Sequence, residues 1–227
     1  MIFNYHPDIR AKYPNLTGGI IVAHSVQNGA SSPELLASYQ AEQQATLKRI
    51  GDIPLSQIES LAAWRAAFRR FGVDPTQIRS ACEALLRRLT KQGDIPSINA
   101  LVDIGNLVSI RYALPVAIVD IRSLTGEITV RFADGTENFT NLGQEEIAHP
   151  DPGEVIFVDD AGLVFARRWC WRQSAESAAR EDTTDLLVTV EAQHEGGRKD
   201  LEAALNDLSG LLQQYTGGTL ESELIGG

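Results

Sequence analysis

Three polar residues recur at helical spacing in an otherwise apolar stretch, PSINALVDIGNLVSIRYALP, residues 96–115. Asn99, Asp103 and Asn106 stand at positions i, i+4 and i+7, so a helix would place them in one stripe. Apolar residues around most of the helix predict that it is buried, and a buried polar group needs a hydrogen-bond partner. The stripe therefore either bonds to neighbouring loops or lines a polar cavity.

A second stretch whose residues could bind a ligand is LVFARRWCWRQ, in which arginines are interleaved with aromatic residues. If the segment is extended, Trp169 and Trp171 share a face, and with the arginines they would form a platform for a base or an aromatic amino acid. The alternative is that the tryptophans belong to the core, which we expect more for Trp169 than for Trp171. Cys170 has no histidine near it in sequence, so we interpret it as a small core residue rather than a nucleophile.

Motifs for metal binding and for nucleophilic catalysis are absent from the sequence. It has no CxxC, HExxH, GxSxG or phosphate-binding glycine loop, and its four histidines are scattered. His24 shares a predicted strand face with apolar residues, which is more typical of a structural histidine. It is nevertheless the best histidine candidate for a general base. We expect neither a metal nor an organic cofactor.

Length and composition are those of an ordinary globular protein. The 227 residues are 43% hydrophobic and carry a net charge of −10, with only two cysteines. We expect no disulfide framework, no signal peptide and no membrane span, which predicts a cytoplasmic protein.

The charge is distributed unevenly along the chain. Residues 64–91 contain seven basic residues against two acidic ones, whereas the region after residue 176 is strongly acidic. Such a cluster is compatible with a local phosphate-binding face, although arginines that only solvate helix surfaces are the alternative. The candidate nucleic-acid contacts are Arg69, Arg70, Arg79, Arg87, Arg88, Arg168 and Arg172.

The positions of glycine, proline and asparagine, together with the period of the apolar residues, predict one strand, a helical block, a strand-rich block and a closing helix. This order favours an α+β fold in a single domain, residues 1–227, with a core at about 18–193. We expect a helix start at Asp74, which precedes Pro75, another at Ser97, and a hairpin turn at DDAG, residues 159–162. We also expect partial disorder in the tail 217–227. The other predicted elements are a strand in 18–29 and helices at 33–50, 55–71 and about 197–216.

Several blocks, in order, resemble the B3/B4 domain. These are PSINALVDIGNLVSIRYA followed by LPVAIVD, then DPGEVIFVDDAG, then EDTTDLLVTVEA, and the resemblance covers residues 18–193. In the β subunit of bacterial phenylalanyl-tRNA synthetase this domain hydrolyses tyrosine wrongly attached to the phenylalanine tRNA. The upstream helix and the closing helix are similar to free-standing members of the family. Nothing in the sequence resembles the ATP-binding catalytic core of the synthetase.

One departure from the family concerns its catalytic histidine. In the stretch that matches PVAIVD the bacterial synthetase has a histidine that assists editing, and here Ala117 occupies that position. A functional glutamate of the family falls near RQSAES, but Glu176 does not align with it unambiguously. The resemblance therefore implies the fold and leaves the editing mechanism open.

The resemblance implies that the polar helix borders the editing cleft. Ester hydrolysis needs a positioned water, donors for the oxyanion and a contact for the substrate ammonium. Asp103, Asp159 or Asp160 would hold the ammonium, and Thr183, Thr184 or main-chain N–H groups would stabilise the oxyanion. The candidate catalytic residues are Asp103, His24, Thr183 and Thr184, and the candidate substrate contacts are Asn99, Asp103, Asn106, Asp159, Asp160 and Trp171.

These observations predict a protein that hydrolyses mischarged aminoacyl-tRNA in trans. Loss of the family histidine favours a first alternative, a non-catalytic module that binds tRNA or an aminoacyl compound. A hydrolase of a small amide or ester is the second alternative, and the acidic net charge fits it. The expected partner is aminoacylated tRNA, with no role for DNA or a membrane.

Overall fold

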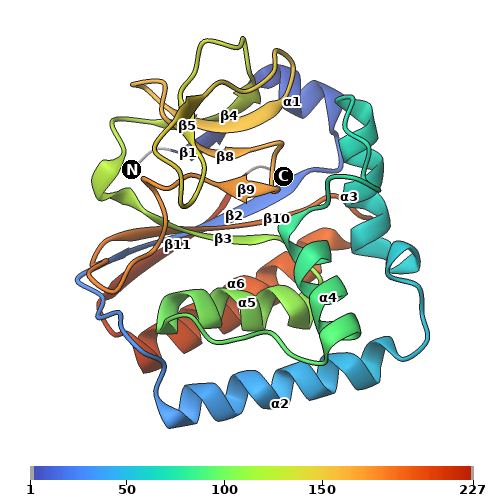
Figure 1. Cartoon of the computed structure of the whole chain (residues 1–227), viewed down its shortest axis with the longest axis vertical. Coiled ribbons are helices and arrows are strands. Elements are labelled where there is room, and N and C mark those ends of the chain that lie inside the picture. The colour runs from blue at the N-terminus through green and yellow to red at the C-terminus, as the bar shows by residue number, and fades with distance from the viewer. Residues whose placement is uncertain (1–2, 226–227) are drawn as a thin grey trace.

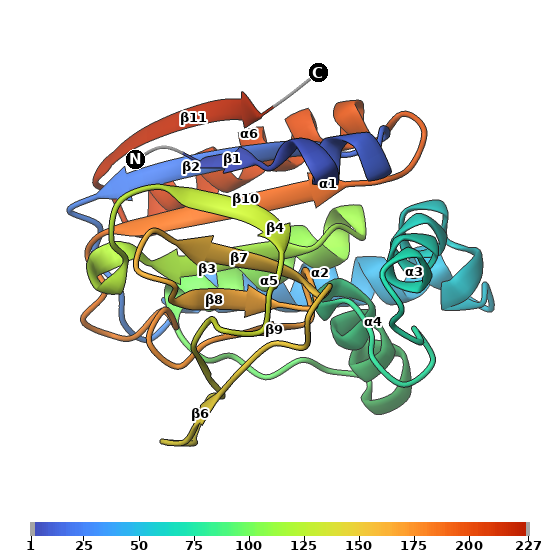
Figure 2. The ribbon, with the colours of Figure 1, turned by 90° about the horizontal axis from the view of Figure 1, so that it is seen from above.

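A computed structural model describes residues 3–225. The predicted α+β class is confirmed, and the elements form three layers, with helices against one sheet and a second sheet above the first (Figure 1). Figure 2 shows from above how the second sheet lies across the first. The candidate site lies where an edge of the first sheet meets a turn of the second.

The four-stranded sheet has the order β11-β2-β10-β3, and every neighbouring pair is antiparallel. All seven residues of β10 are buried, because strands cover both of its edges and packed layers cover both of its faces. The strands are β2 (Thr17–His24), β3 (Val116–Asp120), β10 (Leu186–Ala192) and β11 (Thr219–Ile225).

The expectation of a disordered tail is wrong for residues 219–225. This segment forms β11, which pairs with β2 along its whole length. Gly217 and Gly218 both adopt positive φ (64° and 86°) and make the turn from the last helix into the strand. Residues 226 and 227 lie outside the described part of the chain.

The five-stranded sheet has the order β1-β4-β7-β8-β9, with β1 parallel to β4 and the other pairs antiparallel. A separate two-stranded ribbon, β5 and β6, branches from the segment between β4 and β7. The bounds are β1 (Phe3–Tyr5), β4 (Ile128–Phe132), β5 (Phe139–Thr140), β6 (Ile147–Ala148), β7 (Val155–Asp159), β8 (Val164–Arg167) and β9 (Arg172–Gln173).

In the helical layer, α5 packs against both α2 and α6. Figure 1 shows α4 at the end of this layer and α3 beside the two sheets. The helices are α1 (Pro7–Lys12), α2 (Pro33–Ile50), α3 (Glu59–Arg70), α4 (Ala81–Gln92), α5 (Ala100–Tyr112) and α6 (Gly197–Tyr215), with 3₁₀ turns at Leu55–Gln57 and Ile121–Ser123.

Two helix starts differ from the sequence predictions. α4 begins seven residues after Asp74, because the Asp74 carboxylate accepts hydrogen bonds from the N–H and hydroxyl of Thr76 and closes a local turn. Ser80 caps α4 instead, accepting from the N–H of Glu83. Similarly, Asn99 rather than Ser97 caps α5.

Two apolar cores hold the layers together. One lies between the helices and the four-stranded sheet, and the other lies between the two sheets. Trp169 is fully buried in the second core, with its ring edge-on to Tyr13 and Trp64 at centroid distances of 4.7 and 5.2 Å. This confirms the core interpretation of Trp169. In the described residues, no helix is long and apolar enough to cross a membrane.

Candidate active site

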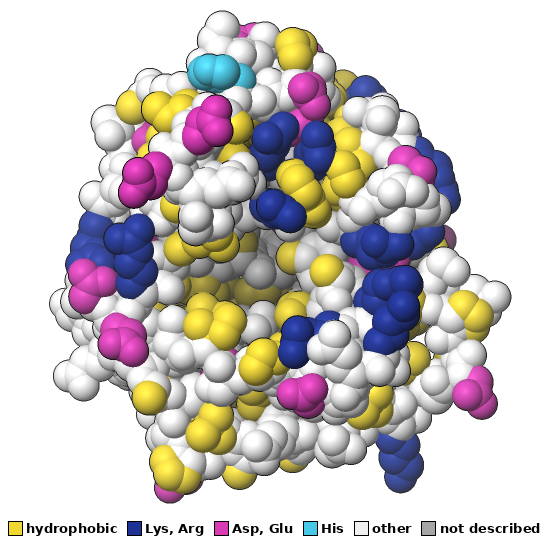
Figure 3. All heavy atoms as spheres, viewed as in Figure 1, with side chains coloured by type: hydrophobic (Ala, Val, Ile, Leu, Met, Phe, Trp, Pro, Cys, Tyr) yellow, Lys and Arg dark blue, Asp and Glu magenta, His cyan; other side chains and the backbone are white. Residues whose placement is uncertain are grey.

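A cleft opens between α4, β3 and the turn that joins β8 to β9. Figure 3 shows it as a deep hollow with a hydrophobic floor and basic side chains along part of its rim. It has two parts, an inner chamber between the two sheets and an outer groove between α4, α5 and the segment after β9. Both parts are lined by Ala81, Val116, Trp171 and Gln173, so they form one continuous cleft.

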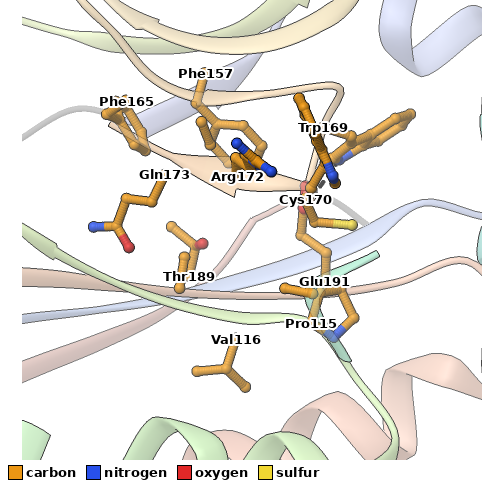
Figure 4. A pocket seen from close by; sticks show the side chains of 14 residues that line it. Pro115, Val116, Phe157, Phe165, Trp169, Cys170, Arg172, Gln173, Thr189 and Glu191 are labelled. Atoms are coloured by element: carbon orange, nitrogen blue, oxygen red, sulfur yellow. Dashed lines mark hydrogen bonds between the residues drawn. The ribbon is translucent and has the colours of Figure 1, made fainter. Parts of the chain in front are cut away.

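The inner chamber is mainly apolar and aromatic. Phe157 and Phe165, with ring centroids 5.4 Å apart, lie on one side, and Val116 and Thr189 lie opposite (Figure 4). Ala117 also lines the chamber, at the position where the sequence predicts loss of the family histidine. The chamber therefore fits an apolar or aromatic group.

Glu191 introduces a carboxyl group into this apolar chamber. It is 3% exposed and accepts hydrogen bonds from the Tyr5 hydroxyl (2.8 Å) and from Nε1 of Trp169 (3.0 and 3.1 Å). Burial raises the pKa of the carboxyl from 4.5 to about 7, although the two donors act in the opposite direction. Near neutral pH this carboxyl group thus occurs in both its protonated and its ionised form, a property common in functional sites.

The turn between β8 and β9 shapes the chamber wall. Arg168 and Trp169 are consecutive non-glycine residues with positive φ, 45° and 63°, a conformation that costs energy and is retained where contacts impose it. Here those contacts are buried: Arg167 and Arg168 both donate to the Glu154 carboxylate, and Trp169 donates to Glu191. The turn therefore does not continue the alternation predicted from the sequence, and Trp169 and Trp171 lie in different environments.

Trp171 lies at the mouth of the cleft. The guanidinium groups of Arg168 and Arg172 lie over its ring, at 4.7 and 4.4 Å from the centroid. A shallow basic groove continues from Trp171 along α4, where it is lined by Arg79, Arg87, Arg88, Lys91 and Arg172. Five of the seven predicted nucleic-acid contacts thus gather at this rim, namely Arg79, Arg87, Arg88, Arg168 and Arg172.

The other two predicted arginines lie elsewhere. Arg69 and Arg70 are at the end of α3, where Arg70 lies over the ring of Tyr13, and neither lines the cleft. Cys170 does line the inner chamber, but burial raises the pKa of its thiol well above the ordinary value. This environment disfavours the thiolate and agrees with the interpretation of Cys170 as a packing residue.

The polar stripe of α5 divides between two roles. Asn99 is the helix cap, accepting from the N–H of Val102 (3.0 Å). Asp103 is fully buried, and its carboxylate accepts hydrogen bonds from Ser31, Ser97 and the N–H of Ile98. Of the three residues of the stripe, Asn106 is the one that lines the outer groove. Contrary to their prediction as substrate contacts, Asn99 and Asp103 do not line the cleft, and both form hydrogen bonds within the chain itself.

Replacing Asp103 by Asn is expected to lower stability by about 1–3 kcal/mol, since an amide donor would face groups arranged around an acceptor. This corresponds to a melting temperature lower by about 2–10 °C, measurable by calorimetry. Asp94→Asn, which removes a carboxylate from an exposed loop, is the control and should melt like the wild type. An unchanged melting temperature with weaker ligand binding would restore Asp103 to the cleft.

The remaining predicted carboxylates and hydroxyls also lie outside the cleft. Asp159 accepts from the N–H groups of Thr125, Ala161 and Leu163 and holds the predicted β7–β8 turn, and Asp160 accepts from the N–H of Glu127. These turn contacts replace the predicted role in binding a substrate ammonium.

The predicted catalytic hydroxyls and histidine gather instead just before the start of β10, where β2 ends. Thr183 donates to Asp120 (2.7 Å), while Thr184 and His24 both contact Asp185. None of the three predicted residues lines the cleft. The structure does not place them as catalytic groups of this cleft, since each is hydrogen-bonded to a carboxylate outside it.

Sequence reasoning missed Thr189 and Glu191. The signal was present in LLVTVEA: along a strand with period two, Thr189 and Glu191 are polar residues on one face, between apolar residues on the other. In the described residues there is no cluster of three or more His, Cys, Asp or Glu side chains that could hold a metal ion.

A family model described as the B3/4 domain matches residues 63–217, which is more than half of the chain. The chain belongs to the B3/4 domain family. The match runs from α3 to the end of α6 and so includes every element that lines the cleft. The resemblance stated from the sequence is thereby confirmed.

Similar proteins include two beta subunits of phenylalanine–tRNA ligase. The one from Shewanella oneidensis is 29% identical over 116 residues, covering 51% of this chain and 14% of the ligase subunit. The one from Nitrobacter winogradskyi is 34% identical over 106 residues, covering 47% of this chain and 13% of the subunit. This B3/4 chain thus matches only a small part of each relative's length.

A crystal structure of an N-terminal fragment of the phenylalanyl-tRNA synthetase beta subunit from Pyrococcus horikoshii has a similar fold. The TM-score is 0.50 at 11% sequence identity, with all of this chain and 54% of that chain covered. At this identity the likeness concerns the fold alone.

Proposed function

We propose that this B3/4 protein hydrolyses the ester bond of mischarged aminoacyl-tRNA in trans, in the cytoplasm, without a metal or organic cofactor. The observation that carries the proposal is the continuity of the cleft, in which an apolar inner chamber opens into a groove with a basic rim. An aminoacyl-tRNA has the matching chemistry, an acyl group esterified to a polyanion. Membership of the family and the similarity to phenylalanine–tRNA ligase beta subunits support the same substrate class.

The roles follow from the chemistry of the lining. Phe157 and Phe165 would enclose the acyl side chain, and Glu191 and Thr189 would offer it polar contacts. Trp171 would stack on a terminal base, while the arginines of α4 bind phosphates without sequence preference. The apolar walls exclude bulk water, so that a single positioned water attacks the ester.

A second candidate function is a non-catalytic module that binds an aminoacyl-tRNA or a free aminoacyl compound. The observation that favours it is Ala117, since the chamber has no imidazole at the position of the family histidine. A hydrolase of small esters or amides would use the same inner chamber but would not need the basic rim.

One assay separates these functions. A panel of tRNAs charged with correct and incorrect amino acids is incubated with the protein, beside amino-acid methyl esters and amides, and release of the free amino acid is measured. Accelerated release from mischarged tRNA supports the proposal. Binding of charged tRNA without release supports the module, and release from the small compounds alone supports the third function.

The basic rim gives a separate prediction for tRNA binding. Arg87 and Arg88 are exposed on α4, and neither makes an ion pair within residues 3–225. The binding constant for tRNA falls with salt, so log K plotted against log salt concentration has a negative slope. Arg87→Ala with Arg88→Ala should make this slope shallower by about one to two. The matched control, Arg198→Ala with Lys199→Ala, removes two charges from α6 and should leave the slope unchanged. An unaltered slope in the α4 variant would exclude this rim as the phosphate contact.

A further inference from the structure

Within residues 3–225, β3 lies at the edge of its sheet with β10 as its one neighbouring strand, and an isolated bridge joins Val119 to Ala178 on the other side. Successive residues of a strand direct their main-chain groups to opposite sides, so half of those in β3 face away from β10. The outward set is identified by two contacts. The N–H of Asp120 donates to the carbonyl of Ser177 (2.9 Å), and the carbonyl of Ile118 accepts from Nε2 of Gln173 (2.8 Å). By alternation, the main-chain groups of Val116 also point outward.

The outward main-chain groups of Val116 have no hydrogen-bond partner among the described residues. Within residues 3–225, neither its N–H nor its carbonyl makes a hydrogen bond outside the β3–β10 ladder. Buried main-chain groups are nearly always paired with protein or water, and those in a cleft are open to a ligand. Val116 is half-buried and lines both the inner chamber and the outer groove. An unused donor and an unused acceptor thus lie at the junction of the two parts of the cleft.

α4 adds a favourable electrostatic field at the same junction. Its first residue, Ala81, also lines both parts of the cleft. The N-terminal end of a 12-residue helix carries a partial positive charge, which stabilises an anion nearby. The N–H of Ala81 itself is occupied by the carbonyl of Cys170 (2.7 Å), so the helix end contributes its field rather than a free donor.

Resting on the proposed function, we propose that the ester carbonyl of the substrate lies at the edge of β3, where the main-chain N–H of Val116 binds the oxyanion. The acyl side chain then occupies the inner chamber and the ribose lies in the outer groove. Water adds its oxygen to the acyl carbon and the carbonyl oxygen becomes negative. The bond from the acyl carbon to the ribose oxygen then breaks, and that oxygen takes up the proton lost by the water.

The part of β3 that lines the inner chamber has no side chain that could act in catalysis, so the main chain supplies the group. Val116 and Ala117 carry no donor and no base, yet both line the inner chamber. A main-chain N–H fixed by a sheet needs no reorganisation during the reaction, which is what effective stabilisation of an oxyanion requires.

The test is replacement of Val116 by its α-hydroxy acid, which exchanges the N–H for an oxygen and keeps the side chain. The rate of deacylation should fall about 100- to 1000-fold, as for loss of one oxyanion donor, while binding of a 3′-aminoacylamido-adenosine changes less than tenfold. Val119, whose N–H points into the ladder and which is buried outside the cleft, is the control. The same exchange there should lower stability and keep the rate per folded molecule.

A second measurement uses the unmodified chain. The Val116 amide should exchange rapidly with solvent in NMR spectra, and it should shift and become protected when 3′-aminoacylamido-adenosine binds. Probe binding with an unchanged Val116 signal, or a full deacylation rate in the Val116 variant, overturns this inference and leaves the proposed function standing. If the wild type neither binds the probe nor deacylates any charged tRNA, the proposed function fails and this inference fails with it.

Discussion

Replacing Glu154 by Ala is expected to lower the free energy of unfolding by about 3–5 kcal/mol, because it leaves a buried guanidinium without its counter-charge. Arg167 and Glu154 are 8% and 4% exposed, and their side chains meet through two hydrogen bonds, Nη2 to Oε1 (2.6 Å) and Nε to Oε2 (3.0 Å). Arg168 adds a third hydrogen bond to the same carboxylate (3.1 Å). Urea unfolding at neutral pH measures the change.

The double variant Glu154→Leu with Arg167→Met distinguishes the charge from the packing. Replacing a buried ion pair by apolar residues of similar volume is often neutral, so the double variant should recover most of the stability lost in the single one. If the single variant lowers the free energy of unfolding by less than about 1 kcal/mol, solvent stabilises the charge of the Arg167 guanidinium once Glu154 is removed. Since Glu154 also holds Arg168 in its positive-φ conformation, the single variant should in addition weaken ligand binding at Trp171.

The sequence was sufficient for elements whose signals are local. α2 has the predicted bounds because each signal acts within a few residues: Ser32 accepts from the N–H of Leu35, Pro33 occupies the first turn, and Gly51 ends the helix at a φ of 51°. The hairpin at DDAG follows the same rule, with Asp159 accepting from N–H groups up to four residues away. Local chemistry therefore predicts the frame that positions the cleft.

The site itself depends on partners that are distant in sequence. The spacing of Asp103 favours a position in the cleft, but its carboxylate accepts a hydrogen bond from Ser31, 72 residues earlier in the chain. Conversely, the Glu191 carboxyl accepts hydrogen bonds from Tyr5, 186 residues away, and from Trp169. Trp169 lies in a turn with positive φ, which the pattern of apolar residues does not predict. Polarity and spacing can identify such residues as buried, but only the tertiary contacts determine which of them faces a ligand.

Glu191 should make the stability of the protein depend on pH in a way that the variant Glu191→Gln lacks. Burial raises the pKa of this carboxyl to about 7 in the folded protein, whereas the ordinary value is 4.5. The folded state therefore binds a proton that the unfolded chain releases between these two values. Its stabilising contribution is complete below pH 4.5 and is lost as the pH rises through about 7.

The difference between the two pKa values corresponds to about 3 kcal/mol, since one pKa unit is equivalent to about 1.4 kcal/mol. We therefore expect the free energy of unfolding of the wild type, relative to that of Glu191→Gln, to fall by about 3 kcal/mol between pH 4.5 and pH 8. Denaturant unfolding of both proteins across this range measures the difference and cancels the titration of the other carboxylates that they share.

Glu195→Gln provides the matched control, because Glu195 is exposed four residues further along and loses the same charge. Its stability should follow the wild-type pH profile. If the difference between wild type and Glu191→Gln stays constant with pH, Glu191 remains ionised throughout, and the donors Tyr5 and Trp169 outweigh its burial. In that case the inner chamber holds a permanent anion, and its acyl ligand should carry a donor or a positive charge rather than a purely apolar side chain.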